Sequence, residues 1–293
     1  MHVRRDGPDG APLTVVLVHC YALDLRVWDA VCEASAGGPF AVVRLDLRGH
    51  GRSDAAGAGA GVPELGDDLA ALLTDLVPDG PVVLVGHSLG GTAVMAMADR
   101  HPDLVADRVA GVALLATSSG DMATMTLGLP GPLARGARWA ERTGMAALAA
   151  LGATRIPCPD PLMRPLTRWL GFGSDPRPAA VAAVSVLAAQ CRIGGVAALR
   201  RAIDEHDCRC ALITFDGIPA VVAVGDEDRV TPVRHAAVIA QWLPGARLVV
   251  YPGAGHMLPV ERSAEVARLL AGLADDSLAA WSRRDGTGWR LAA

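Results

Sequence analysis

The five residues from Gly86 to Gly90 read Gly-His-Ser-Leu-Gly and stand between an apolar run and a stretch of helical character. The run is Val82–Val85, which is typical of a buried strand, and the stretch begins at Gly91. A serine at a sharp strand-to-helix turn has its hydroxyl lifted above the end of the sheet, and flanking glycines are needed because such a turn leaves no room for side chains. The alternative is an ordinary turn whose serine caps the helix. The strand–turn–helix context favours a nucleophile, so Ser88 is the primary candidate for catalysis.

Short apolar runs rich in β-branched residues alternate with segments of helical period along most of the chain. The expected strands are Leu13–Val18, Phe40–Leu45, Val82–Val85, Val109–Leu115, Pro219–Val224 and Arg247–Tyr251. The expected helices between them are Pro63–Val77, Gly91–His101, Val233–Trp242 and Ala264–Ala274. Runs that are apolar throughout suit strands buried on both faces, as in a parallel sheet covered by crossover helices. The sequence therefore predicts an α/β fold with a mostly parallel central sheet flanked by helices.

One interval, from about Gly120 to Phe215, contains no clear strand. Its expected helices are Pro130–Leu151, Pro161–Leu170, Ala179–Arg192 and Gly194–His206. Ligands of open α/β sheets bind at the carboxyl edge of the strands, where a helical lid would exclude water. We therefore expect residues 121–214 to form an inserted helical cap, and residues 1–120 and 215–293 to form the core, with the tail after Asp275 either helical or frayed. The large apolar side chains expected mainly in the core of this cap are Trp139, Trp169, Met122, Met125, Met163 and Phe172.

Length and charge limit the class of protein. A chain of 293 residues, 51% of them hydrophobic, can bury a large core. The net charge of −4 and the absence of a long basic run exclude the electrostatic pattern of a nucleic-acid-binding protein. No uninterrupted apolar run reaches the length of a membrane span. We expect a small-molecule substrate as the partner, no nucleic acid and no membrane, with a homodimer as an open alternative.

The cysteines indicate neither disulfides nor a metal site. They are Cys20, Cys32, Cys158, Cys191, Cys208 and Cys210. The closest pair, Cys208 and Cys210, is one residue tighter than a C-x-x-C motif. Arg4 and Arg5 precede an apolar stretch, but Asp6 and Asp9 interrupt any export signal. We therefore expect reduced thiols in a cytoplasmic protein that uses no metal and no cofactor.

A serine nucleophile needs a general base and an acid that orients the base, and candidates for both follow later expected strands. One of these strands leads into Asp226 and Asp228, and the last leads through a glycine-rich loop to His256. The order serine, acid, base along the chain is one of the known orders of such triads. We predict that His256 takes the proton of Ser88 at Nε2 while Asp228 holds Nδ1–H. Asp226 and Asp121 are the alternative acids.

Two backbone amides are expected to form an oxyanion hole. The segment His19-Cys20-Tyr21 directly follows an expected strand, so Cys20 or Tyr21 can offer one N–H. Leu89, the first residue after the serine, can offer the second. The residues expected to line the substrate pocket are His19, Trp28, Met122 and Met125.

Five motifs in this order resemble the α/β-hydrolase superfamily, in the lineage with a G-H-S-x-G-G turn around the serine. They are His19-Cys20 followed by Trp28, Asp46–Ser53, Gly86–Gly91, Gly225–Pro232 and Gly253–His256. The resemblance covers roughly residues 12–120 and 215–275. It implies the α/β-hydrolase fold and a covalent acyl-enzyme mechanism on ester-like substrates, with Ser88 as nucleophile, His256 as base and Asp228 as acid.

Two features depart from that family. Its members usually carry glycine where this chain has Cys20, because the loop runs beside the reacting centre. A small buried hydrophobe is the favoured interpretation of Cys20, since a neutral buried thiol is unreactive. The alternative is a thiol that narrows the oxyanion hole or reaches the substrate. In addition, the short lead before Leu13 leaves room for one N-terminal strand instead of two.

The sequence therefore predicts a cofactor-independent serine hydrolase acting on a small or medium apolar ester, thioester or lactone. The chain has no dinucleotide fingerprint and no metal motif, so side chains must supply the chemistry. An alternative keeps the same triad for non-hydrolytic work, as a C–C lyase, perhydrolase, biosynthetic cyclase or acyltransferase. A third hypothesis is a ligand receptor on a hydrolase scaffold, because fold does not fix function.

Overall fold

A seven-stranded sheet forms the centre of the computed structural model, which describes residues 1–57, 60–151, 153–155 and 160–286. The strands are β1 (Val3–Asp6), β2 (Thr14–Val18), β3 (Ala41–Leu45), β4 (Val82–His87), β5 (Val109–Leu115), β6 (Ala220–Gly225) and β7 (Arg247–Tyr251). Their order across the sheet is β1-β3-β2-β4-β5-β6-β7, and every neighbouring pair is parallel except β1 with β3. The predicted fold class is confirmed.

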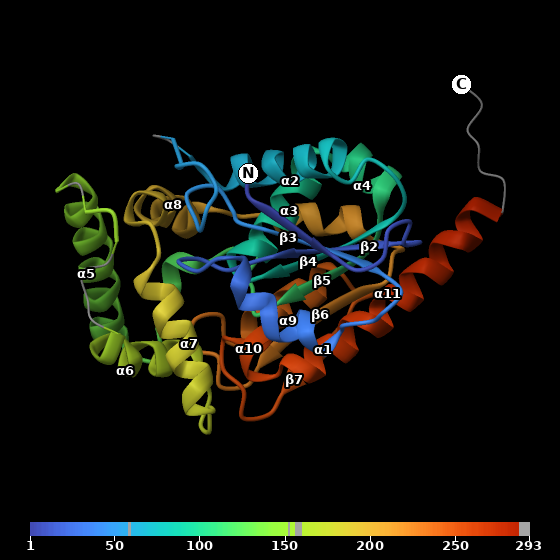
Figure 1. Cartoon of the computed structure of the whole chain (residues 1–293). Coiled ribbons are helices and arrows are strands. Elements are labelled where there is room, and N and C mark those ends of the chain that lie inside the picture. Colours follow the sequence, from blue (N-terminus) through green and yellow to red (C-terminus); the bar gives the residue numbers. More distant parts are fainter. Residues whose placement is uncertain (58–59, 152, 156–159, 287–293) are drawn as a thin grey trace.

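Helices cover both faces of the sheet (Figure 1). Those outside the interval between β5 and β6 are η1 (Leu25–Trp28), α1 (Asp29–Ala34), α2 (Val62–Asp75), α3 (Leu89–Arg100), α4 (Pro102–Arg108), α9 (Val233–Trp242), α10 (Leu258–Glu261) and α11 (Ser263–Gly286). Alternate strand residues enter two separate apolar clusters: Leu84 of β4 packs with α2, α3 and α9, whereas Val83 and Val85 pack with α1 and α11. Because both of their faces are buried, the central strands β5 and β6 are apolar at every position.

The edge strand β1 carries exposed arginines and has no strand-like apolar pattern. It pairs antiparallel with β3, and Arg44 of β3 links it to the rest of the molecule. The nearly buried guanidinium of Arg44 donates to Asp6 of β1 at 2.6 Å and to Asp29 of α1 at 2.5 Å. In the described structure β1 is the strand that precedes β2, and its position was not predicted.

Helices fill the interval between β5 and β6, which we call the helical insertion. They are η2 (Met122–Thr124), α5 (Gly131–Ala150), α6 (Asp160–Gly171), α7 (Pro178–Ala189), α8 (Ile193–Glu205) and η3 (Cys210–Phe215). Figure 1 shows α5 and α6 at one end of the molecule, far from α11 at the other. The expectation that Trp139 and Trp169 are core residues of this insertion is wrong, since they are 68% and 43% exposed. The insertion is too thin there to cover both sides of α5 and α6.

The C-terminal tail continues α11 as a regular helix as far as Gly286, which matches the helical alternative. Ser277 of this helix is fully buried beside β5, where the missing side chain of Gly111 leaves room for its hydroxyl. Cys158 and residues 287–293 lie outside the described residues. The other five cysteines are free thiols. Among the described residues, no helix has the length and apolar character needed to span a membrane.

Candidate active site

Ser88 forms the whole of the turn between β4 and α3, because β4 ends at His87 and α3 begins at Leu89. Its backbone has φ of 54° and ψ of −117°, a conformation that is strained for any residue with a side chain. The end of β5 holds the turn on both sides. The Ser88 N–H donates to the Leu115 carbonyl at 2.9 Å, and the Thr117 hydroxyl donates to the Ser88 carbonyl at 2.6 Å.

The glycines beside Ser88 are required by contacts with backbone. A Cβ atom on Gly86 would lie 2.4 Å from Gly91, and one on Gly90 would lie 2.2 Å from the carbonyl oxygen of Val18. Gly91 belongs to α3 and Val18 to β2, so neither backbone can move without disturbing the helix or the sheet. The pentapeptide is therefore a geometric requirement for bringing a serine to the carboxyl edge of the sheet.

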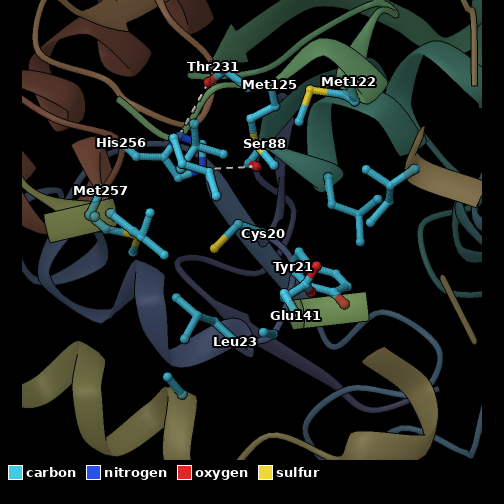
Figure 2. Close-up of a pocket in the computed structure, with 18 of the residues that line it drawn as sticks. Cys20, Tyr21, Leu23, Ser88, Met122, Met125, Glu141, Thr231, His256 and Met257 are labelled. Atoms are coloured by element: carbon cyan, nitrogen blue, oxygen red, sulfur yellow. Dashed lines mark hydrogen bonds between the residues drawn. The ribbon is translucent and has the colours of Figure 1, made fainter. Parts of the chain in front are cut away.

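The structure brings together the three side chains of the predicted triad. His256 Nε2 lies 3.0 Å from Ser88 Oγ (Figure 2), and His256 Nδ1 lies 2.9 Å from Asp228 Oδ2. The three residues come from the end of β4 and from the loops that follow β6 and β7. A carboxylate can only accept, so Nδ1 carries the ring proton and the lone pair of Nε2 faces the serine hydroxyl. This is the tautomer that a general base requires.

The carboxylate of Asp228 is buried and accepts four hydrogen bonds. Oδ1 accepts the amides of Val230 and Thr231, both at 2.8 Å, and Oδ2 accepts the Thr231 hydroxyl at 2.8 Å as well as His256. Burial by itself raises the pKa of Asp228, but His256 and the hydrogen bonds from Thr231 outweigh it and hold this pKa below its ordinary value. The group is therefore an anion at neutral pH.

The alternative acids lie elsewhere. Asp226 is exposed, and its Oδ1 accepts the amide of Gly253 at 2.7 Å, so it supports the loop that leads to His256. Asp121 is also exposed, and its carboxylate lies 3.4 Å from Arg209. The geometry therefore favours Asp228 over both.

Trp28, expected in the substrate pocket, is instead fully buried against His87, and that prediction is wrong. The two rings meet edge to face with their centroids 6.2 Å apart. His87 Nε2 is 2.8 Å from the carbonyl oxygen of His256 and donates to it. Burial, with a contribution from neighbouring His256, lowers the pKa of His87 to about 3, so its ring is neutral. Trp28 and His87 thus form a support beneath the backbone of His256.

His19 is also fully buried and does not line the cavity, so its expected place in the pocket is wrong. The amide of Leu47 donates to His19 Nε2 at 2.9 Å, which leaves the ring proton on Nδ1. That N–H donates to the carbonyl of Cys20 at 2.7 Å. In a trans peptide the carbonyl of one residue and the N–H of the next point in opposite directions. His19 therefore fixes the direction of the Tyr21 amide.

The amides of Tyr21 and Leu89 remain the candidate oxyanion donors, since neither donates to another group in the described part of the chain. The side chain of Cys20 lines the cavity between Ser88 and Tyr21 (Figure 2). Burial raises the pKa of the Cys20 thiol to about 12, so it is neutral. This supports the interpretation of Cys20 as a small buried hydrophobe.

A cavity of about 290 Å³ opens beside Ser88. Met122 and Met125 line it, as the sequence predicts, and the insertion supplies further apolar walls. These walls are Met163, Leu166, Leu170, Val184 and Ile203. Arg200 on the wall is compensated by acidic groups, since it lies 2.7 Å from Glu141 and 3.0 Å from Asp204. Arg138 also lines the cavity, and its guanidinium donates to the backbone carbonyl of Ala123. The cavity is therefore suited to an uncharged apolar group.

Comparison with known proteins agrees with this fold. Residues 14–263 match the model of a family described as "alpha/beta hydrolase fold". The chain belongs to this family. An uncharacterized protein of Mycobacterium tuberculosis is 30% identical over 269 residues, which cover 84% of this chain and 71% of that protein. A pimeloyl-[acyl-carrier protein] methyl ester esterase of Chromobacterium violaceum is 28% identical over 269 residues, covering 90% and 93% of the two chains.

Similar solved structures support the same fold for this hydrolase. The enol-lactonase of Burkholderia xenovorans LB400 superposes with a TM-score of 0.69 at 27% identity, covering 93% of this chain and 95% of that one. A thermophilic esterase from Thermogutta terrifontis has a TM-score of 0.75 at 24% identity, with coverage of 94% and 93%, and supports the fold alone. The family and its esterase, lipase and lactonase relatives make this chain an enzyme of hydrolase type.

Sequence reasoning missed two residues that support the catalytic loops of the hydrolase. Thr231 donates its hydroxyl to Asp228 and lies 3.3 Å from His256 Nδ1. Glu261 accepts the amide of Gly255 at 2.9 Å and that of Gly173 at 3.1 Å, which ties the His256 loop to the segment between α6 and α7 of the helical insertion. Thr231 precedes Pro232 of the motif that contains Asp228, so its position in the sequence was a weak indication that it lies near the site. Glu261 carried none, because its partners are backbone amides.

Proposed function

We propose that this hydrolase cleaves small or medium apolar esters, thioesters or lactones without a cofactor, through an acyl-enzyme on Ser88. The observation that carries the proposal is the continuous chain of hydrogen bonds from Asp228 through His256 to Ser88, which ends in an apolar cavity. The volume of about 290 Å³ lies near the lower end of ligand pockets, which span about 300 to 1,000 Å³. This favours a small substrate.

The first half-reaction forms the acyl-enzyme. His256 Nε2 takes the proton of Ser88 as Oγ attacks the substrate carbonyl, and the negative charge that develops on the carbonyl oxygen faces the amides of Tyr21 and Leu89. The bond to the leaving group then breaks, and His256 returns the proton to the departing alkoxide or thiolate. Asp228 stays ionised and stabilises the imidazolium that exists between these steps.

The second half-reaction releases the acid. Water takes the place of the leaving group, loses a proton to His256 and attacks the acyl carbonyl, after which the bond to Ser88 Oγ breaks and His256 reprotonates the serine. The helical insertion acts as a cap that selects the acyl or alcohol group, because it supplies much of the apolar wall. A cytoplasmic location stays a prediction, as does a homodimer.

A fluorophosphonate probe tests the proposal directly. Wild-type protein should gain one adduct by intact mass, mapped to Ser88, and Ser88→Ala should gain none. The same two proteins are then compared on p-nitrophenyl acyl esters, acyl thioesters and lactones. An adduct at another residue, or turnover retained by Ser88→Ala, would show that Ser88 is not the nucleophile. Products of transfer or rearrangement in place of the free acid would favour the non-hydrolytic alternatives.

A further inference from the structure

We propose that the outer surface of α5 and α6 docks on a lipid surface with anionic headgroups, from which apolar substrates pass into the cavity. This interaction lies beyond the proposed chemistry and holds whether or not the bound lipid is itself cleaved. It departs from the expectation of no membrane partner, which rested on the lack of a membrane-spanning run and does not concern docking on a lipid surface. The residues of this docking surface are Leu133, Arg135, Trp139 and Arg142 of α5 and Leu162, Leu166 and Trp169 of α6.

The first observation is the exposure of large apolar side chains. Trp139 is 68% exposed, Leu162 69% and Leu133 62%, and α5 has one buried residue, Ala134, in its whole length. A protein that acts alone in water rarely gathers tryptophan and leucine at such exposure on one part of its surface. Trp169 is less open, because Arg229 lies 4.5 Å above its ring and its Nε1 donates to Leu127.

The second observation is that the docking surface continues into the cavity. Leu162, Leu166 and Trp169 follow one another at the spacing of a single helix face. Leu166 also lines the cavity, as do Met163 and Leu170 on the adjacent face of α6. The helix therefore presents one apolar row outward and another inward, so an apolar molecule can move along α6 from the docking surface towards Ser88.

The third observation is the positive charge of this part of the chain, which favours an anionic lipid surface as the binding partner. Residues 131–171 contain six arginines and two acidic residues, a net charge of +4, whereas the whole chain has −4, so the rest of the chain has −8. Arg135 and Arg142 stand four residues before and three residues after Trp139, on the same face of α5. Arg142 is half-exposed and lies 3.7 Å from Asp204 of α8, so Arg135 is the main cation beside Trp139. Exposed tryptophan and leucine flanked by arginine are typical of helices that lie in a lipid–water interface.

The charge distribution also orients the molecule. The potential of an anionic surface falls off within about 8 Å at physiological ionic strength, so it attracts the basic end that touches the surface and acts weakly on the acidic remainder. The side of the cavity that Leu166 of α6 lines then lies next to the lipid. A second copy of this chain, whose acidic remainder could also attract the basic end, is the competing occupant that the test must separate.

The test uses Ser88→Ala protein, so that no lipid is hydrolysed during measurement. Its partition onto vesicles of phosphatidylcholine with phosphatidylglycerol is measured by co-sedimentation and compared with pure phosphatidylcholine. We expect binding to the anionic vesicles that weakens with salt. Trp139→Gln with Leu162→Gln should lower the partition coefficient about tenfold. Arg135→Gln should lower it about fivefold, which corresponds to about 1 kcal/mol per basic residue.

The matched control is Trp242→Gln, because Trp242 of α9 is 45% exposed but lies outside the docking surface. It should leave the partition unchanged. In the protein with an intact Ser88, the docking-surface variants should keep their activity on a water-soluble ester and their thermal unfolding midpoint. Equal vesicle binding by all variants, or none by the parent, overturns the proposal. A dimer in sedimentation velocity that Trp139→Gln dissociates, without vesicle binding, would assign the surface to a second copy.

Discussion

Asp228→Asn is the substitution whose effect follows most directly from the hydrogen bonds of the site. It preserves the shape of the side chain but replaces one acceptor oxygen by an NH2 donor. The backbone amides of Val230 and Thr231 can only donate, so they keep the remaining oxygen at the position of Oδ1. The NH2 group must then occupy the position of Oδ2 and face His256 Nδ1.

This arrangement forces the imidazole of His256 into the other neutral tautomer. To accept from the new NH2 group, His256 Nδ1 must lose its proton, and the ring proton moves to Nε2, which lies 3.0 Å from Ser88 Oγ. A protonated Nε2 cannot take the serine proton. A triad held in the wrong tautomer loses about 10⁴-fold in kcat, which is about 5 kcal/mol of transition-state stabilisation. KM should change little, because Asp228 does not line the cavity.

The assay is kcat and KM on one activated ester, with the thermal unfolding midpoint as a check on folding. Asp226→Asn and Asp121→Asn are the matched controls, since both change an exposed carboxylate that makes no contact with His256. Asp226→Asn also keeps an oxygen that can accept the Gly253 amide, so the loop that leads to His256 retains its support. Both should keep nearly full kcat. If either control were the more damaging change, or if Asp228→Asn kept most of the wild-type kcat, the assignment of the acid and the tautomer argument would both be wrong.

Three further predictions concern the surroundings of the triad. His19→Ala removes the hydrogen bond to the Cys20 carbonyl and so frees the Tyr21 amide to turn away from the substrate. In steady-state assays kcat should fall by up to about 10²-fold with little change in KM, and a His101→Ala control should keep its kcat. The pKa of Asp228 is lower in the folded protein than in the unfolded chain, where it is about 3.9, so this carboxylate stabilises the fold at pH values above about 3.9. The stabilisation is lost as the pH falls through the pKa of the folded state. In urea unfolding, the stability difference between wild type and Asp228→Asn should therefore be constant near neutral pH and shrink below about pH 4. Cys20→Gly should leave the partition of the acyl group between water and an added alcohol unchanged, and a shift towards hydrolysis would give the thiol a role in a transfer reaction.

The sheet and the position of the nucleophile could be predicted because their causes act on consecutive residues. Burial on both faces makes a strand apolar throughout, and a turn of one residue forces glycine around Ser88. The order of serine, acid and base along the chain can likewise be recognised from the sequence. Strand β1 could not be located in this way, because Val3–Asp6 is polar and is fixed by its pairing with β3 and by Arg44.

The direction of each side chain was decided only by tertiary structure. His19 and Trp28 are close to the predicted oxyanion loop in sequence. In the structure His19 instead bonds to the amide of Leu47, and Trp28 packs against His87, so neither side chain lines the cavity. In the helical insertion, the sequence determined that helices form, since their apolar period is local. It did not determine that Trp139 faces outward, because burial depends on what distant parts of the chain place against a side chain, and nothing in the described structure is placed against the outer face of α5.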